Sequence, residues 1–83
     1  MKLLYFAWVR EKIGRAEEDL DPPPEVRRVS DLLDWLRGLG PEYRAALADA
    51  ARIRVAVNQA HAKPDAAVGR QDEVAIFPPV TGG

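Results

Sequence analysis

The two most apolar segments of this chain lie near its opposite ends, and that placement constrains the fold more than any other feature of the sequence. In the segment KLLYFAWV (residues 2–9) both alternating sets of side chains are apolar, and DEVAIF (residues 72–77) is the second apolar run. A strand that is apolar on both faces usually lies in the centre of a sheet. We therefore expect these segments to be neighbouring central strands, which a right-handed crossover makes parallel.

The sequence after the first strand predicts a hairpin and then a helix. Residues 15–20 (RAEEDL) alternate weakly after Gly14, which predicts an exposed second strand paired with the first. Three consecutive prolines at 22–24 form a stiff connector. Ser30 is the expected N-cap of the main helix, with Asp31 in its first turn, where the helix dipole favours a carboxylate. The apolar face of this helix consists of Leu32, Leu33, Trp35, Leu36 and Leu39.

The second half of the chain predicts a short helix, a strand and an edge strand before the last apolar run. Residues 42–50 have a helical pattern, residues 53–58 alternate as a strand, and residues 59–68 form a loop with a short edge strand. This order predicts an α+β domain, in which one mixed sheet carries one main helix packed on one face. We expect the core to include Leu4, either Tyr5 or Phe6, Leu33, Leu36, Val57, Val74 and Ile76.

Composition argues against several classes of protein. A chain of 83 residues forms one domain, and its 12 basic and 13 acidic residues give a net charge of −1, which does not favour a nucleic acid as partner. No apolar run is long enough to cross a membrane, so no membrane partner is expected. Without cysteines or a signal-peptide pattern, we expect a cytoplasmic protein that has no disulfides.

The polar side chains do not form a recognisable catalytic or metal site. His61 has no second histidine or cysteine with which to bind zinc, so no metal site is predicted. The acidic residues at 17–21 alternate in direction along a strand, and a solvated strand edge explains them better than a cation site does. There is no Gly-rich phosphate loop and no plausible Ser, His and Asp set, so the chain has no catalytic machinery of its own and no bound cofactor is expected.

In the segment IFPPVTGG, two prolines follow the last apolar strand and two glycines come at the end. The prolines at 78–79 cannot extend a strand ladder and hold the backbone extended. Gly82 and Gly83 have no side chain, so they fit a slit too narrow for any other residue. We therefore expect a body of residues 1–77 and a flexible Gly-Gly arm of residues 78–83. A terminal carboxylate on this arm becomes reactive towards sulfur or an amine once it is activated as an acyl phosphate or adenylate.

Three stretches resemble the family of molybdopterin synthase small subunits: FAWVREKIG (6–14), VAVNQ (55–59) and above all DEVAIFPPVTGG (72–83). The resemblance covers essentially the whole chain and implies the β-grasp, or ubiquitin-like, fold. It also implies a sulfur carrier of molybdenum cofactor biosynthesis. In that family the C-terminal glycine is adenylated with ATP by an E1-like enzyme, converted to a thiocarboxylate, and used to donate sulfur to cyclic pyranopterin monophosphate.

Carried over to this chain, the resemblance makes Gly83 the residue that bears the sulfur and Gly82 its neighbour in the slit. The partners that it implies are the large synthase subunit, in a heterotetramer of two small and two large subunits, the E1-like adenylating enzyme and a sulfur donor protein. The chain would then be a non-catalytic, sulfur-donating subunit, and ATP would act on Gly83 only in the activating enzyme. The arm inserted into the large subunit would consist of Pro78, Pro79, Val80 and Thr81.

The resemblance also implies a contact surface for these partners. Phe6 and Phe77 match hydrophobic contact positions of the family, and Arg10 matches a basic position near them. His61 stands where relatives often have an apolar residue, so we expect a more polar contact there. Residues 69–75 (GRQDEVA) differ from the usual DGDEVA turn before the last strand, so this turn is expected to differ as well.

Three other functions are compatible with a Gly-Gly ending. The related sulfur carrier of thiamin thiazole synthesis has the same last two residues, but it is shorter and usually lacks the double proline. A ubiquitin-like modifier that is joined to lysines of other proteins would leave an isopeptide-linked ladder in cell extract. An interaction domain with an inert tail would be indifferent to deletion of the tail.

Overall fold

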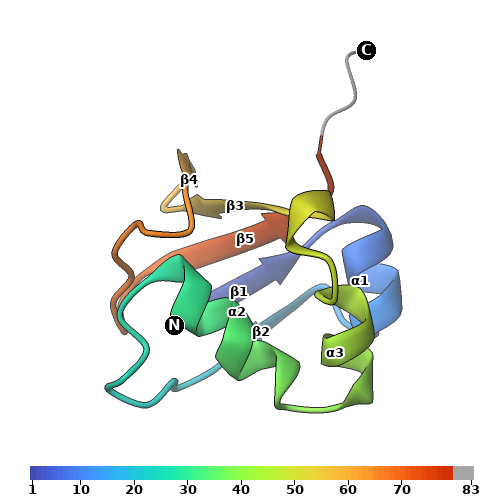
Figure 1. The fold of residues 1–83 in the computed structure, drawn as a ribbon, viewed down its shortest axis with the longest axis horizontal. Helices are drawn as coiled ribbons and strands as arrows, with labels where there is room; N and C mark the ends of the chain where they lie inside the picture. Colours follow the sequence, from blue (N-terminus) through green and yellow to red (C-terminus); the bar gives the residue numbers. More distant parts are fainter. Residues whose placement is uncertain (80–83) are drawn as a thin grey trace.

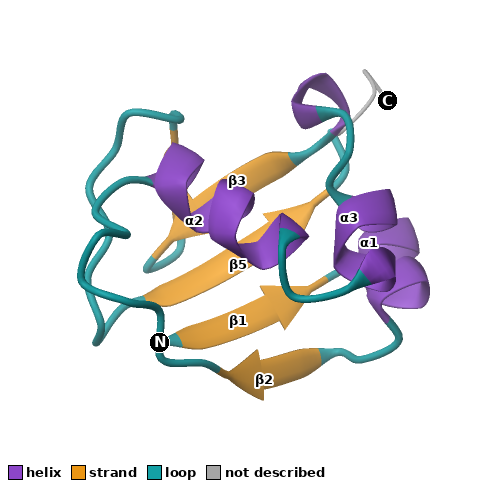
Figure 2. Ribbon diagram, turned by 60° about the horizontal axis from the view of Figure 1, so that its bottom comes forward, coloured by secondary structure: helices purple, strands orange, loops and turns teal. Residues whose placement is uncertain are grey.

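A computed structural model describes residues 1–79 and shows five strands and three α-helices in that part of the chain. The strands are β1 (Lys2–Tyr5), β2 (Glu17–Asp19), β3 (Arg54–Val57), β4 (Ala60–Ala62) and β5 (Glu73–Phe77). The helices are α1 (Ala7–Ile13), α2 (Val29–Arg37) and α3 (Pro41–Ala46), and a short 3-10 helix, η1, covers Ala50–Arg52. Helix α2 lies across one face of the sheet, whereas α1 and α3 contact each other at one end of it (Figures 1 and 2).

Strands β1 and β5 are the central neighbours of the sheet, whose order is β2-β1-β5-β3-β4, and they run parallel as the sequence predicts. Their register pairs Leu3 with Val74 and Tyr5 with Ile76. The other pairs are antiparallel, with β2 beside β1, β3 beside β5, and β4 beside β3. A mixed sheet of this order, crossed by one main helix, is the β-grasp arrangement, and the predicted fold class is confirmed.

The first strand is shorter than the sequence predicts, because it ends at Tyr5 and not at Val9. Helix α1 begins at Ala7, where φ is 51°, and it buries Val9 and Ile13 on one face. Gly14 ends this helix with a φ of 90°, in the left-handed region that favours glycine. Apolar residues four apart before a glycine indicate a helix, but the same residues also alternate as in a strand, and this ambiguity explains the wrong prediction.

The main helix begins before Ser30, so the predicted N-cap is wrong. The N-cap is Arg28, and its N–H donates to the Asp31 carboxylate at 3.1 Å. Asp31 lies in the first turn as predicted. Val29, the first residue of α2, is buried, and its N–H donates to the Ala66 carbonyl at 2.9 Å. Packing against a distant loop therefore sets the start of α2, and local capping preferences do not reveal it.

The predicted helix of residues 42–50 is divided in two. Helix α3 ends at Ala46, and the next residue, Leu47, is fully buried. Asp49 then caps η1, since its carboxylate accepts the Ala51 N–H at 3.0 Å. The chain thus turns between the two helices and enters β3.

The core lies between the helices and one face of the sheet. Leu4 and Val57, which the sequence places in the core, are only half-buried, and Phe6 is exposed. Leu4 points away from the helices, because side chains alternate along a strand and its neighbours Leu3 and Tyr5 point towards them. The other predicted core residues are buried, namely Tyr5, Leu33, Leu36, Val74 and Ile76.

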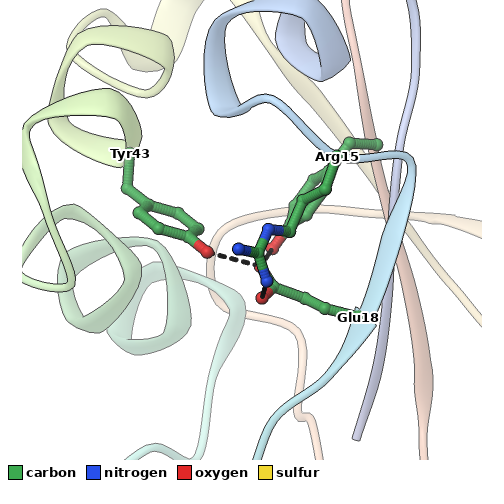
Figure 3. Close-up of polar contacts among 4 residues, drawn as sticks. Arg15, Glu18 and Tyr43 are labelled. Carbon is green, nitrogen blue, oxygen red and sulfur yellow. Dashed lines mark hydrogen bonds and ion pairs between the residues drawn. The ribbon is translucent and has the colours of Figure 1, made fainter.

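Glu18 joins β2 to two other elements through its carboxylate (Figure 3). Tyr5 on β1 and Tyr43 on α3 each donate a hydroxyl hydrogen bond to Glu18 Oε2 at 2.7 Å, and Arg15 Nη1 donates to Oε1 at 2.9 Å. The side chain of Glu18 is only 9% exposed, so these donors replace the water that a carboxylate needs. Burial and the hydrogen bond to this carboxylate raise the pKa of both tyrosines. The acidic stretch is therefore not wholly the solvated edge that the sequence predicts.

Candidate functional site

One face of the sheet has no helix of residues 1–79 over it, and we call it the outer face (Figure 2). The register places Leu4 of β1, Ala75 of β5, Ala56 of β3 and His61 of β4 in one row across this face. Leu4 and the two alanines are half-buried, whereas His61 is exposed. The centre of the outer face is therefore apolar, and an uncovered apolar sheet face is typical of a surface that binds another protein.

Four of the predicted contact residues lie near the end of the outer face where β5 ends. Phe77 is half-buried, and the His61 ring meets it edge-on, with 5.6 Å between the ring centroids. Phe6 is 47% exposed, and its N–H donates to the Ile76 carbonyl at 3.1 Å. Arg10 is exposed one helical turn later, and its N–H donates to the Phe6 carbonyl at 3.3 Å. Two aromatic rings, an imidazole and a guanidinium thus come from β5, the start of α1 and β4.

The end of β5 is also the root of the expected arm. Pro78 and Pro79 follow Phe77 and are half-buried. Arg54 pairs with Phe77 across β3 and β5, and its guanidinium donates to the Ile53 carbonyl at 2.9 Å. Arg54 is not among the site residues that the sequence predicts, and its only signal is its position at the start of an alternating strand. The predictions for Val80, Thr81, Gly82 and Gly83 fall outside the described residues.

The side chains around Phe77 form an arrangement that can bind another protein. Within residues 1–79, no three His, Asp or Glu side chains lie together in a group that could hold a metal ion. None of the helices in this part of the chain has the length and the apolar content that a membrane span requires. The groups around Phe77 are aromatic and cationic, and they suit recognition of a protein surface.

Comparison with known proteins relates the whole chain to one group. The family model described as the ThiS family matches residues 3–83. The molybdopterin synthase sulfur carrier subunit of Haemophilus influenzae is 36% identical, and the match covers 100% of this chain and 99% of that protein. The corresponding subunit of Escherichia coli is 35% identical, again with 100% and 99% covered. Among solved structures, SAMP1 from Haloferax volcanii, a small archaeal modifier protein, is 31% identical with a TM-score of 0.78, and 100% of this chain and 98% of that chain are covered.

Proposed function

The chain belongs to the ThiS family, and from this relationship we propose that it is the sulfur carrier subunit of a molybdopterin synthase. Two bacterial relatives bear that name and align with the chain along nearly their whole length. This end-to-end match is the observation that carries the proposal, because it includes the segment FPPVTGG on which the chemistry depends.

In the proposed reaction, the Gly83 carboxylate attacks the α-phosphorus of ATP in the activating enzyme, and pyrophosphate leaves. Hydrosulfide, delivered by a donor protein, then attacks the acyl carbon, AMP leaves, and Gly83 ends in a thiocarboxylate. In the large subunit the thiocarboxylate sulfur displaces an oxygen substituent of cyclic pyranopterin monophosphate to form a thioester. Water then hydrolyses this thioester, which leaves the sulfur on the pterin and returns Gly83 to a carboxylate. Two such transfers build the dithiolene. The chain itself holds no cofactor in this scheme, and ATP is bound by the activating enzyme.

The outer face supports the role of a subunit that works in complexes. Leu4 and Phe6 belong to the most apolar segment of the chain, yet the helices do not cover them. A second protein that covers this face would complete the burial of that segment. Both the activating enzyme and the large subunit must receive the same arm, so they bind the chain in turn. In the synthase we propose two small and two large subunits.

The experiment that tests the proposal follows the mass of the chain. The intact protein is incubated with its E1-like enzyme, ATP and a sulfur donor, and we expect pyrophosphate release followed by a mass increase equal to sulfur minus oxygen. The reaction without ATP is the control, and there the mass should stay unchanged. The loaded chain, mixed with the large subunit and cyclic pyranopterin monophosphate, should then yield molybdopterin. A chain that is never loaded under these conditions would contradict the proposed function.

The likeness to a small archaeal modifier protein favours a second candidate function. In that case the activated Gly83 acyl group would react with a lysine amine of another protein and not with sulfur. An epitope-tagged chain expressed in its own organism would then produce a ladder of conjugates that resists thiol reagents. If only the free chain is present while molybdopterin is made, the sulfur carrier function is the better description.

A further inference from the structure

A hollow beside Trp8 is separate from the outer face and carries its own charges. It has a volume of about 310 Å³ and lies between α1 and the segment that joins α3 to η1. Its wall includes Trp8 and Lys12 from α1 and Asp49 and Arg52 from the other side, and three alanines between residues 45 and 48 leave it room. A volume at the low end of the small-molecule range suits a single side chain better than a larger ligand.

Two cations from different elements share one aromatic ring in this hollow. Lys12 Nζ lies 5.5 Å from the centroid of the Trp8 ring, and Arg52 Cζ lies 5.8 Å from it. Within residues 1–79, neither cation has a carboxylate within ion-pair distance. Asp49 lines the same hollow, but its carboxylate already accepts the N–H of Ala51. The hollow therefore has one positive charge in excess, and bringing two like charges together favours an anion between them.

The hollow lies at the root of the arm. Trp8 comes two residues after Phe6, whose N–H donates to the Ile76 carbonyl at the end of β5. Arg52 comes two residues before Arg54, which pairs with Phe77. Strand β5 runs towards the end of the sheet at which α1 and η1 lie (Figures 1 and 2). A protein that binds the arm therefore lies close to Lys12 and Arg52.

We propose that the hollow formed by Trp8, Lys12 and Arg52 receives an aspartate or glutamate side chain of the large subunit, beside the point where the arm enters it. This inference rests on the proposed function. It adds a second point of attachment, which fixes the direction of the arm and excludes partners that lack a carboxylate at this place. A phosphate of the nucleotide is not the expected occupant. Six residues reach at most about 20 Å when fully extended, so the arm is long enough for the reaction at its tip to take place away from the hollow.

The test compares two double variants that lose the same charge. Lys12→Gln with Arg52→Gln empties the hollow of its cations, whereas Lys63→Gln with Arg70→Gln removes two cations elsewhere on the surface. All four side chains are exposed, so both variants should fold, and circular dichroism checks this. Calorimetric titration with the large subunit at low and high salt should show a Kd at least about tenfold higher for the hollow variant, with a weaker salt dependence. The control should stay within about twofold of the wild type.

A second measurement separates a protein carboxylate from a small anion. The chain is labelled with 5-fluorotryptophan, and its two fluorine signals are assigned with Trp8→Phe. The large subunit should shift the Trp8 signal, whereas inorganic phosphate at matched ionic strength should not. A saturable shift with phosphate alone would show that the hollow binds a small anion, and this result would overturn the proposal of a protein carboxylate. Wild-type chain that does not bind the large subunit would overturn the proposed function itself, whereas equal affinities of the two double variants would overturn only this inference.

Discussion

Among single residues, Phe77 is the one on which partner binding should depend most. Its ring is half-buried on the outer face, against His61, and a partner would complete its burial. Phe77→Ala should weaken binding to the large subunit by about 2 kcal/mol or more, as is typical of aromatic anchors, while the fold survives. Leu39→Ala is the matched control, because Leu39 is exposed just after α2 and off the sheet. Calorimetry that finds equal affinities for both variants would remove Phe77 from the site.

Tyr5 should make the stability of the folded chain sensitive to alkaline pH. Burial and the hydrogen bond to Glu18 raise the pKa of Tyr5 in the folded chain, whereas an unfolded tyrosine ionises near pH 10. The stabilising contribution is therefore complete below about pH 10 and decreases above it, by up to about 1.4 kcal/mol per pH unit. In urea unfolding over a pH series, Tyr5→Phe should lack this part of the decrease.

The same variant has a second expected effect at neutral pH. It removes one of two hydroxyl donors to the Glu18 carboxylate, so the free energy of unfolding should fall by about 1.5–3 kcal/mol. Tyr43→Phe is a useful companion, because Tyr43 donates to the same oxygen from a more exposed position. If Tyr5→Phe and the wild type lost stability in parallel as the pH rose, the shifted pKa would not be the cause.

At the scale of elements, two glycines at helix ends should respond differently to the same change. Gly14 ends α1 with a φ of 90°, and an added Cβ would contact nothing within 4 Å, so Gly14→Ala should cost about 1–2 kcal/mol of backbone strain alone. Gly38 follows α2 with a φ of −80°, and its Cβ would lie 3.4 Å from the Trp35 carbonyl oxygen. Gly38→Ala should therefore be nearly neutral. Denaturant titrations that show equal losses would contradict this account.

The elements also show why sequence patterns predict some features and miss others. The central pair was predictable because residues 74–77 and the start of the chain are apolar on both alternating faces. Helix α1 was not predictable, because the spacing of Val9 fits both a strand and a helix. The start of α2 was not predictable either, because it depends on the distant Ala66 carbonyl. The bonds of Glu18 depend on the register of β2 and on the position of α3, which no local pattern encodes. The assignment of Phe6 and Phe77 as expected contact residues came from a family resemblance and not from periodicity.

For the whole molecule, the proposed function separates the part that must be stable from the part that must react. All buried apolar residues of the described chain lie between Leu3 and Ile76, so the core is complete before the arm begins. Phe77 on the outer face and the hollow beside Trp8 both lie at the end of the sheet where β5 ends. In the proposed function, the body provides the binding surface and the arm provides the reactive group. A change at the tip should consequently affect the chemistry and leave the stability unchanged.

Deletion of Gly83 tests this separation directly. The shortened chain presents its terminal carbonyl one residue early, by up to about 3.6 Å, and a misplacement of about 1 Å can already cost roughly a hundredfold in rate. We expect thermal unfolding to match the wild type, because the buried core of the described residues ends at Ile76, while thiocarboxylate formation and molybdopterin synthesis are lost. A chain with one residue appended after Gly83 is a second test variant. It moves the terminal carbonyl one residue too far, and it should fail in the same way. If either variant still supported molybdopterin synthesis with the large subunit, Gly83 would not be the residue that carries the sulfur.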